Sequence, residues 1–591
     1  MKLLNRLTGR MATHVQAVPA APGPDRDRGL APDPDRGRGR YTVDATVEQL
    51  VFVASLFWAL SANRAFLAAT LQGRSLSDAS AWGFGAAMFV LAVALHGLLL
   101  LLVANRWTVK PLLVFLTLVT ASAGYYMTAY GVYLDPSMLR NVLRTNLGEA
   151  RELMGPQWLL HMLVYAGLPL LLLWRVRLVN RPALRATGVR LGVLLLSAGV
   201  LVGAVVSVFQ PLASLMRNHK EVRYLITPAN LLWSVGSIAV ADARGAAQPR
   251  QAIGLDAAPG PSWATRQKPL VVVMVVGETA RAANWGLNGY ARQTTPQLAQ
   301  LPVLNFGAVH ACGTNTEVSL PCMFAPVGRR DYDEARIRGQ QSLLHVAARA
   351  GVAVHWRDNQ SGCKGVCEGL PNDQVSPANA PGLCTGDQCL DEGLLHDLDR
   401  RLNLAKGTQL WVLHMLGNHG PSYFRRHPPG FAKFQPECRD DDLRRCTPQQ
   451  ITNSYDNALL YTDHVLATAI AKLQAHSTEV DTALVFVSDH GESLGEHGLF
   501  LHGMPYAIAP EVQTRVPMVM WFSDGFERGA GFKAGCLRPA LQRVAGPTAA
   551  RPVAHDHLYA SLLGLLDVRS QTRDAAWDLT QVCRDTAVAA K

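Results

Sequence analysis

Five long apolar segments occupy the first part of the chain and limit what it can fold into. They lie near residues 47–69, 81–104, 110–132, 157–174 and 191–213. Each approaches the roughly 20 residues that an α-helix needs to cross a lipid bilayer. The segments must be helical there because lipid cannot satisfy backbone polar groups. Buried helices of soluble proteins are usually shorter and rarely recur in this way, so we predict a five-helix transmembrane domain over residues 46–214.

Basic residues in the connecting loops predict which side of the membrane each loop occupies. They are concentrated in the N-terminal tail and in the loops after the second and fourth segments, and include Arg26, Arg28, Arg36, Arg38, Arg40, Arg106, Lys110, Arg175, Arg177, Arg181, Arg185 and Arg190. If the segments alternate, these regions share one side, and their positive charge marks it as cytoplasmic. The loop after the third segment also carries arginines, a contrary signal, but acidic residues accompany them. An odd number of crossings then leaves the C-terminal region outside the cytoplasm.

The N-terminal tail and the net charge bear on the partners of the chain. Residues 1–45 are rich in Pro, Gly, Asp and Arg and cannot bury enough apolar surface to fold, so we predict a disordered cytoplasmic tail. The net charge of +11 is compatible with nucleic-acid binding. However, the basic residues lie where they would orient a membrane protein or touch anionic lipid, and no basic–aromatic nucleic-acid motif occurs. We therefore expect the membrane, and no nucleic acid, as a partner.

All ten cysteines lie after residue 311. An even number of cysteines in close pairs is typical of a disulfide-bonded protein in an oxidising compartment. Zinc-ribbon ligation is the alternative, but the chain has no Cys-x-x-Cys pair. Proximity in the sequence predicts the pairs Cys312–Cys322, Cys363–Cys367, Cys384–Cys389 and Cys438–Cys446, and leaves Cys536–Cys583 to close a longer loop.

The region after a mixed linker at residues 215–266 has the pattern of an α/β domain, which we assign to residues 267–591. The runs PLVVVMVVGE, QLWVLHML and TALVFVSDH are typical of buried parallel strands. Between the last two, NSYDNALLYTDHVLATAIAKLQ has apolar residues at helical spacing. This alternation implies a mostly parallel sheet, in which functional groups lie just beyond the carboxyl ends of the strands.

Polar side chains follow three of these predicted strands. Glu278 follows the first, His419 lies beyond the second, and Asp489 and His490 follow the third, while His502 comes a little later. Singly, each has an ordinary explanation, such as a helix N-terminal glutamate or a buried structural histidine. Together, two carboxylates and three imidazoles at one sheet edge suit zinc, which takes oxygen and nitrogen ligands in a compact shell.

The segment CGTNTEVSLPC holds the candidate nucleophile. Cys312 and Cys322 flank the hydroxyls of Thr314, Thr316 and Ser319, and a disulfide between them would hold a hydroxyl rigidly before a helix N-terminus. A free hydroxyl is a poor nucleophile, but zinc coordination lowers its pKa. The alternative, that the hydroxyls only cap the helix, stays open for Thr314 and Ser319.

Several segments resemble a known family. GETARAANWGLNGYARQTTPQL, CGTNTEVSLPCMF, WRDNQSGCKGVC, GNHGPSYFRR and SDHGESLGEHGLFLHGMP are similar to segments of the lipid A phosphoethanolamine transferases, which include the mobile colistin-resistance enzymes. The resemblance runs in order from about residue 47 to about residue 565. It implies a five-span helical anchor in the inner membrane of a Gram-negative cell, followed by a periplasmic α/β domain with an alkaline phosphatase/sulfatase-like fold.

The resemblance also implies roles for residues of the predicted site. Thr316 matches the second threonine of the family's CGTxT motif, which makes it the nucleophile rather than a helix cap. Glu278, Thr316, Asp489 and His490 would hold one catalytic zinc ion. His419 and His502 match positions that contact the substrate phosphate or a second zinc ion.

Further residues are implied to bind the substrate. Lys364 and Ser361 match residues near the phosphoethanolamine group. Tyr130, Asn141 and Glu149 fall in YGVYLDPSMLRNVLRTNLGE, which matches the family's lipid-facing segment. For Asn141 and Glu149, the role of ordinary solvated loop residues remains the alternative.

The implied reaction moves phosphoethanolamine from phosphatidylethanolamine to lipid A through a covalent intermediate on Thr316. The added amine would reduce the negative charge of the lipid and weaken the binding of cationic peptides such as polymyxin. Alternatives are the same chemistry on another envelope acceptor (a core sugar or glycan), a phosphoglycerol donor, a sulfatase-like hydrolase and a non-catalytic receptor. The last two are disfavoured because the Cys-x-Pro-x-Arg motif of sulfatases is absent at the nucleophile position and all the predicted zinc ligands are present. We expect a monomer.

Overall fold

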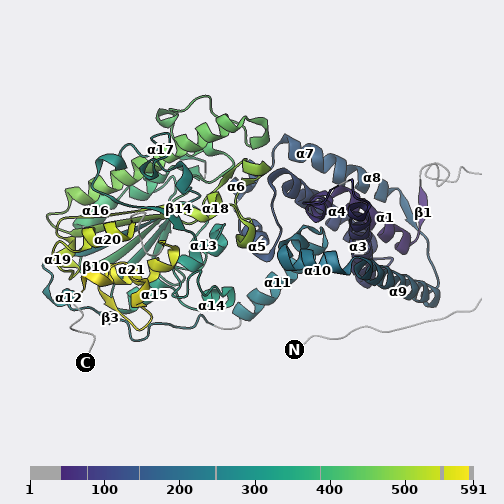
Figure 1. The fold of residues 1–591 in the computed structure, drawn as a ribbon, viewed down its shortest axis with the longest axis horizontal. Coiled ribbons are helices and arrows are strands. Elements are labelled where there is room, and N and C mark those ends of the chain that lie inside the picture. The colour runs from purple at the N-terminus through teal and green to yellow at the C-terminus, as the bar shows by residue number, and fades with distance from the viewer. Residues whose placement is uncertain are drawn as a thin grey trace, which may run out of the picture.

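The computed structural model describes residues 42–75, 77–145, 147–246, 249–386, 388–545 and 552–584. Figure 1 shows two bodies, a helical domain (residues 42–246) and an α/β domain (residues 249–584). Most of the tail predicted to be disordered, residues 1–41, lies outside the described residues. Its predicted end at residue 45 is slightly wrong, because Val43–Ala45 form strand β1, which pairs in parallel with β2 (Val176–Leu178).

Four described helices are long and apolar enough to cross a membrane: α3 (Ala79–Val103), α4 (Val109–Tyr130), the continuous helix Pro156–Trp174 and α9 (Ala183–Ser207). Pro156–Trp174 comprises α7 (Pro156–Met162), a π-helical turn (Leu163–Gly167) and α8 (Leu168–Trp174). A fifth crossing requires α1 (Val47–Ser61) and α2 (Arg64–Leu71), which meet at a 57° bend, to form one broken span. The described residues therefore hold four or five candidate spans, where the sequence predicted five.

A buried asparagine accounts for the bend between α1 and α2. The Asn63 side-chain amide donates to the carbonyls of Trp58 (2.9 Å) and Thr227 (2.7 Å), and its oxygen accepts from the Thr227 backbone N–H (3.0 Å). A side chain that hydrogen-bonds the backbone in this way competes with regular helix bonds and favours a kink. The partner Thr227 lies far along the chain, so the apolar pattern alone gives no sign of the bend.

Shorter helices connect the two domains. Helices α5 (Pro136–Arg144) and α6 (Leu147–Leu153) follow α4, and α10 (Phe209–Asn218), a 3₁₀ turn (Lys220–Leu225) and α11 (Ala229–Ala246) follow α9. In Figure 1, α5, α6 and α11 lie between the two bodies. The predicted linker at 215–266 is therefore partly helical, because Leu231 and Ile238 are buried in the same apolar cluster as residues of α4.

A seven-stranded sheet forms the centre of the α/β domain, in the order β5-β14-β11-β4-β10-β6-β7. Five strands run parallel: β4 (Leu270–Gly277), β6 (Ala353–Asp358), β7 (Asn372–Gln374), β10 (Thr408–His414) and β11 (Asp481–Ser488). Only β14 (Arg515–Phe522) runs in the opposite direction: it pairs antiparallel with β11 on one side and with the edge strand β5 (Leu304–His310) on the other. The three strands that the sequence predicted, β4, β10 and β11, are adjacent in the middle, and β4 is buried along its whole length.

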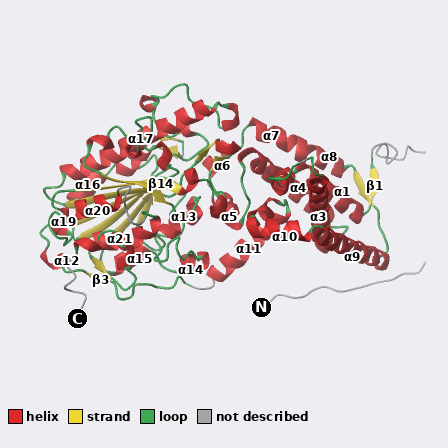
Figure 2. Ribbon diagram, viewed as in Figure 1, coloured by secondary structure: helices red, strands yellow, loops and turns green. Residues whose placement is uncertain are grey.

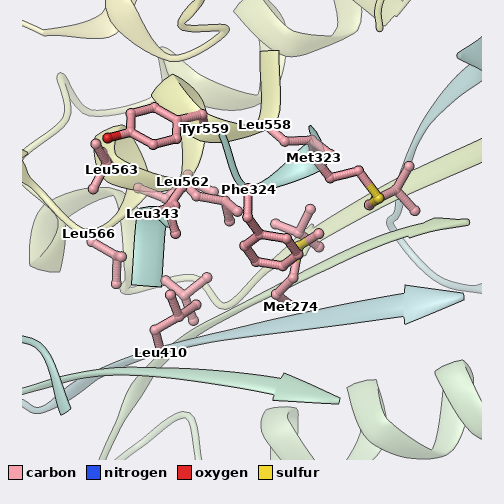
Figure 3. Packing of buried hydrophobic residues seen from close by; sticks show 14 of the residues in the cluster. Met274, Met323, Phe324, Leu343, Leu410, Leu558, Tyr559, Leu562, Leu563 and Leu566 are labelled. Carbon is pink, nitrogen blue, oxygen red and sulfur yellow. The ribbon is translucent and has the colours of Figure 1, made fainter. Parts of the chain in front are cut away.

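Alternate residues of the central strands enter two different cores, one on each face of the sheet. In β4, Val272, Met274 and Val276 belong to one apolar cluster, and Val271, Val273 and Val275 belong to the other. Figure 3 shows Met274 and Leu410 of the first cluster packed beneath Phe324, which follows the helix Thr316–Met323, and beneath Leu343 and Leu562 from the covering helices. A strand buried on both faces consists of a continuous run of apolar residues, which explains the apolar pattern of β4 in the sequence.

Helices cover both faces of this sheet, as Figure 2 shows. The longest, α17 (Pro448–Ala475), contains the helix that the sequence predicted and packs with α16 (Leu398–Asn403) on one face. The other face is covered by α15 (Leu343–Arg349), α20 (Leu537–Ala545) and α21 (Leu558–Leu565).

The other α-helices of this domain are short: α12 (Ser262–Thr265), α13 (Thr316–Met323), α14 (Glu334–Gly339), α18 (Glu511–Thr514) and α19 (Phe526–Gly529). The strands outside the main sheet are also short: β3 (Ala258–Pro259), β8 (Cys384–Thr385), β9 (Gln388–Cys389), β12 (Ser493–Leu494), β13 (Phe500–Leu501) and β15 (Val568–Arg569).

Disulfides close loops only in the α/β domain. The structure joins the pairs expected from proximity in the sequence: Cys312–Cys322, Cys363–Cys367, Cys384–Cys389, Cys438–Cys446 and Cys536–Cys583. Because every cysteine is paired, the α/β domain suits an oxidising compartment.

Candidate active site

Two neighbouring strands of the sheet end in the acidic and imidazole groups of the predicted metal site. Glu278 follows β4 and Asp489 and His490 follow β11, with Gly277 and Ser488 in register. The Nε2 atom of His490 lies 3.2 Å from Glu278 Oε1 and 3.4 Å from Asp489 Oδ2. All three side chains are completely buried. The parallel ends of β4 and β11 therefore bring together three candidate metal ligands that are far apart in the sequence.

Each carboxylate has one oxygen held by the protein and one that is not. Glu278 Oε2 accepts hydrogen bonds from Thr316 Oγ1 (3.0 Å) and Gln360 Nε2 (3.2 Å), and Asp489 Oδ1 accepts from the His490 backbone N–H (2.7 Å). Among the described residues, Glu278 Oε1 and Asp489 Oδ2 accept no hydrogen bond. Buried carboxylate oxygens are costly without a partner. The orphaned oxygens and the adjacent imidazole nitrogen therefore fit a divalent cation with a preference for oxygen and nitrogen ligands, such as zinc.

The electrostatics of the cluster also favour a positive charge between Glu278, Asp489 and His490. Burial raises the pKa of Asp489, and the Glu278 carboxylate raises it further, to about 7. Burial by itself lowers the pKa of His490, but Asp489 and Glu278 outweigh burial and raise it to about 10. Burial also works against ionisation of Glu278, yet His490 keeps the pKa of this carboxyl below its usual range. The cluster thus concentrates carboxylate groups in a buried place, which favours a cation there.

Thr316 is the hydroxyl that reaches this cluster. It is the first residue of α13, whose N-cap is Asn315, and its Oγ1 lies 3.0 Å from Glu278 Oε2 and 3.4 Å from His490 Nε2. The other two hydroxyls of the loop have backbone partners, since Thr314 donates to Met504 O (2.6 Å) and Ser319 donates to Asp489 O (2.5 Å). The helix cap is therefore Asn315, and only Thr316 of the three hydroxyls contacts both a carboxylate and an imidazole of the cluster.

His419 and His502 lie beside the cluster. The ring of His502 is 4.4 Å from that of His490 and 5.5 Å from that of His419, measured between centroids. Glu492 orients His502, because its Oε2 lies 2.7 Å from His502 Nδ1 while its Oε1 accepts from the Tyr423 hydroxyl (2.7 Å). The three histidines therefore form a row that begins at the metal cluster.

Gly417 allows the loop that carries His419 to approach Glu278 closely. It has φ of 53°, and a Cβ at this position would lie 2.7 Å from the Glu278 carbonyl oxygen. The neighbouring Asn418 N–H donates to that same oxygen (3.0 Å). Only glycine avoids a steric penalty at such a conformation and distance.

Comparisons with known proteins agree with this arrangement. Residues 271–568 match the sulfatase family, and residues 92–243 match the family described as phosphoethanolamine transferase EptA/EptB. The chain is 36% identical over 540 residues to phosphoethanolamine transferase EptA of Escherichia coli (strain K12), covering 90% of this chain and 96% of that protein. The chain belongs to the phosphoethanolamine transferase family. The transferase is also 36% identical over 555 residues to phosphatidylethanolamine transferase Mcr-1 of Escherichia coli, covering 91% and 98% of the two chains.

A solved structure resembles the transferase along nearly its whole length. It is the integral membrane lipooligosaccharide phosphoethanolamine transferase A (EptA) from Neisseria meningitidis, with a TM-score of 0.85, 36% identity, and coverage of 92% of this chain and 99% of that one. The soluble domain of that protein has also been solved alone and matches with a TM-score of 0.53 at 42% identity. The transferase is thus an integral membrane enzyme whose α/β domain has a sulfatase-like fold.

The predicted substrate-binding residues of the transferase fall into two groups. Lys364 Nζ donates to Ser361 Oγ (2.6 Å), and both lie on the loop whose Gln360 donates to Glu278, so this pair borders the cluster. Tyr130 instead packs in an aromatic cluster with Tyr126 and Phe500. Asn141 lies on α5 and Glu149, which is buried, lies on α6, in the segment between α4 and α7.

Sequence reasoning missed several residues that contact the site of the transferase. Gln360, beside Ser361 in a quoted motif, bonds Glu278 directly. His555 connects the loop that carries Thr316 to β11, since its Nδ1 accepts from the Cys312 N–H (3.0 Å) and its Nε2 donates to Ser488 O (3.0 Å). Arg144 of α5 donates to Glu317, the residue after Thr316 (2.9 Å). Only the motif position of Gln360 could have indicated its role, since the others depend on the tertiary fold.

Proposed function

We propose that the transferase moves phosphoethanolamine from phosphatidylethanolamine to a phosphate of lipid A, with Thr316 as the nucleophile. The observation that carries the proposal is the position of Thr316 Oγ1 between Glu278 Oε2 (3.0 Å) and His490 Nε2 (3.4 Å). The substrate class is supported by relatives whose names specify it, such as the Kdo(2)-lipid A phosphoethanolamine 7''-transferase of Escherichia coli (strain K12), at 29% identity over 567 residues.

The proposed metal site consists of Glu278, Thr316, Asp489 and His490. Zinc bound there would act as a Lewis acid that lowers the pKa of the Thr316 hydroxyl and offsets charge on the phosphoryl group. Glu278 Oε2, which accepts the hydrogen bond of Thr316, orients this hydroxyl and is the first acceptor for its proton. One zinc ion would satisfy the orphaned carboxylate oxygens, Glu278 Oε1 and Asp489 Oδ2, and His419 and His502 would bind either the substrate phosphate or a second zinc ion.

In the first proposed step, Thr316 Oγ1 attacks the phosphorus of phosphatidylethanolamine. A bond forms between Oγ1 and phosphorus, and the bond from phosphorus to the glycerol oxygen breaks. The glycerol oxygen takes up the proton that Thr316 gave to Glu278, and diacylglycerol leaves. His419 and His502 stabilise the charge on the phosphoryl oxygens, since preorganised donors in a dry site are the main source of rate enhancement in such transfers. Lys364, Ser361, Tyr130, Asn141 and Glu149 would bind the donor.

In the second step, a phosphate oxygen of lipid A attacks the phosphorus and releases Thr316. The product gains an amine, so its net negative charge falls and cationic peptides such as polymyxin bind it less tightly. Resistance to polymyxin would be the cellular consequence.

We further propose that the α/β domain lies in the periplasm of a Gram-negative cell, with the helical domain in the inner membrane and the N-terminus in the cytoplasm. The arginine-rich loop between α8 and α9 and the N-terminal tail lie on one side in this arrangement. The pairing of β1 with β2 supports it, because it joins these two regions directly. The paired cysteines support an oxidising compartment for the α/β domain.

Covalent labelling tests the nucleophile. Purified enzyme incubated with phosphatidylethanolamine labelled in its ethanolamine group is expected to retain label after acid quenching, and the Thr316→Ala variant is expected to retain none. Thr314→Ala is the matched control, because the Thr314 hydroxyl donates to a backbone carbonyl (2.6 Å) and it should still become labelled. Label that persists in Thr316→Ala would rule out this nucleophile.

Mass spectrometry of lipid A tests the acceptor. A polymyxin-sensitive Gram-negative host that expresses the enzyme should gain a phosphoethanolamine increment on lipid A, and the same host with Thr316→Ala should not. An increment on a core sugar or glycan alone would move the acceptor to that molecule, and an increment of phosphoglycerol would overturn the donor.

A further inference from the structure

A buried ion pair joins helix α6 to the α/β domain close to the row of histidines. Arg426 Nη2 lies 2.6 Å from Glu152 Oε2, and the two side chains are only 1% and 3% exposed. The other oxygen of Glu152 accepts from Gln388 Nε2 (2.7 Å). Both carboxylate oxygens of Glu152 are thus committed to the α/β domain, although α6 belongs to the helical domain.

Arg426 also contacts the backbone of His419. Its Nε donates to the backbone carbonyl of His419 (2.7 Å), while its Nη2 is held by Glu152. Arg426 is also seven residues beyond His419, so a single guanidinium connects the loop that carries the histidine to a helix outside the sheet. Because a guanidinium is planar and rigid, the position that Glu152 gives to Nη2 fixes the direction of the Nε–H bond.

The burial of this pair is unusual for a simple stabilising contact. Removing two charges from water carries a desolvation penalty that often cancels their attraction, so a buried ion pair is weak grounds for assigning a stabilising role. A buried ion pair is better explained by its fixing the positions of the groups that it contacts. Here the geometry that is fixed belongs to the loop of His419, whose ring lies 5.5 Å from that of His502.

We propose that Glu152 and Arg426 are positioning residues for phosphoryl transfer. Through these two residues, the packing of α6 against the α/β domain determines the position of His419. This inference rests on the proposed function, in which His419 stabilises the phosphoryl group. It assigns to the helical domain a part in catalysis beyond anchoring and lipid contact: the site is completed only when α6 is docked.

The test uses the full chain, purified in detergent, with lipid A as acceptor and a phosphatidylethanolamine with a fluorescent acyl chain as donor. Conversion of the donor to fluorescent diacylglycerol gives kcat and KM. Arg426→Lys keeps the charge beside Glu152 but loses the bond to the His419 carbonyl, and Glu152→Gln keeps the size of the side chain but loses the charge. Both are expected to lower kcat roughly ten- to a hundredfold, with KM within about twofold, since a small misplacement of a group that acts in the transition state has that effect.

Arg425→Lys is the matched control. Arg425 neighbours Arg426 but is 45% exposed and pairs with Asp441 at the surface (3.1 Å). Its kcat and KM should equal those of the parent enzyme. If Arg426→Lys does not fold, Glu152→Gln carries the test, because it is nearly isosteric: its amide oxygen can accept from Arg426, and the Gln388 amide can turn so that its oxygen accepts from the new NH2 group.

A double-mutant cycle shows whether the two residues act through His419. In a His419→Ala background, Glu152→Gln is expected to lower kcat by less than about twofold, because the group that it positions has gone. Equal effects of Glu152→Gln in both backgrounds, or a rise in KM with unchanged kcat, would overturn the proposal in favour of direct lipid binding by α6. Failure of the parent enzyme to release diacylglycerol would instead overturn the proposed function, so the two failures are distinguishable.

Discussion

Among single residues, His555 connects the loop that carries Thr316 to β11, the strand that Asp489 follows. Its two ring nitrogens bond the backbones of Cys312 and Ser488, and both bonds require a neutral ring with the proton on Nε2. Complete burial lowers the pKa of His555 to about 3. A protonated ring would lose the acceptor that holds Cys312, so this histidine must stay neutral for the loop to keep its place.

The depressed pKa predicts a pH dependence of stability. In the unfolded chain, His555 takes up a proton near the usual histidine pKa of about 6.5, whereas in the folded chain it stays neutral down to about pH 3. The free energy of unfolding therefore falls as the pH decreases between these two values. Between pH 7 and pH 5 the expected loss is about 2 kcal/mol from this residue. His555→Gln, which cannot titrate, should lose correspondingly less stability in thermal unfolding at the two pH values.

The exposed His396 provides the control for this measurement. His396→Gln should show the same pH dependence as the parent chain. An unchanged pH dependence in His555→Gln would mean that another group takes up the proton.

Among the secondary-structure elements, strand β10 lies between Gly407 and Gly417. Both glycines have a left-handed backbone conformation, but their surroundings differ. Gly407 has φ of 61° with no atom within 4 Å of the position of a Cβ, and Gly417 has φ of 53° with the Glu278 backbone 2.7 Å away. The first glycine only turns the chain into the strand. The second also lets the loop beyond β10 pack on the metal-ligand loop beyond β4.

This difference predicts unequal effects of the same substitution. Gly407→Ala should cost about 1 kcal/mol of stability through its left-handed backbone alone. Gly417→Ala should cost about 3 kcal/mol, because the clash with the Glu278 backbone adds to the strain. Gly417→Ala should also weaken zinc binding, measured by titration of the metal-free enzyme, while Gly407→Ala should not. Equal losses in the two variants would contradict the close approach.

On the scale of the whole molecule, the helical domain contacts the α/β domain at points close to the site. Arg144 of α5 pairs with Glu317, the residue after Thr316, and Glu152 of α6 pairs with Arg426. Arg444 of the α/β domain donates to the Tyr125 hydroxyl of α4 (2.7 Å). These contacts are charged or polar rather than broadly apolar. They favour one relative position of the two domains.

Removal of the metal should affect the stability and the activity of the full chain together. A chelator is expected to abolish diacylglycerol release and to lower the thermal unfolding midpoint, because binding to the folded state alone contributes about 4 kcal/mol when the metal is at a thousand times its dissociation constant. Readdition of zinc should restore both. Asp489→Asn should show no shift of the midpoint with zinc, and a zinc-dependent shift of normal size in that variant would contradict the ligand assignment.

The local pattern of the sequence determined the elements and the chemistry that each one carries. Apolar runs of membrane length predicted the helices, since lipid imposes that length, and continuous β-branched runs predicted β4, β10 and β11, since strands buried on both faces have no polar alternation. The residues that follow those strands included Glu278, Asp489 and His490 because the chemistry of a parallel sheet gathers at its carboxyl edge. The motifs pointed to Thr316 through their resemblance to a family.

Only the tertiary structure decided which distant residues meet. Asn63 bends a predicted span because Thr227 bonds it, part of the predicted linker is the helix α11 because its apolar residues find a core beside α4, and Glu152 and Arg426 pair across 274 residues of sequence. The Asn63–Thr227 and Glu152–Arg426 contacts have no periodic signature, since a single pair of residues makes each of them. Their energy comes from burial and from the direction of a hydrogen bond, and both exist only once the two domains have packed.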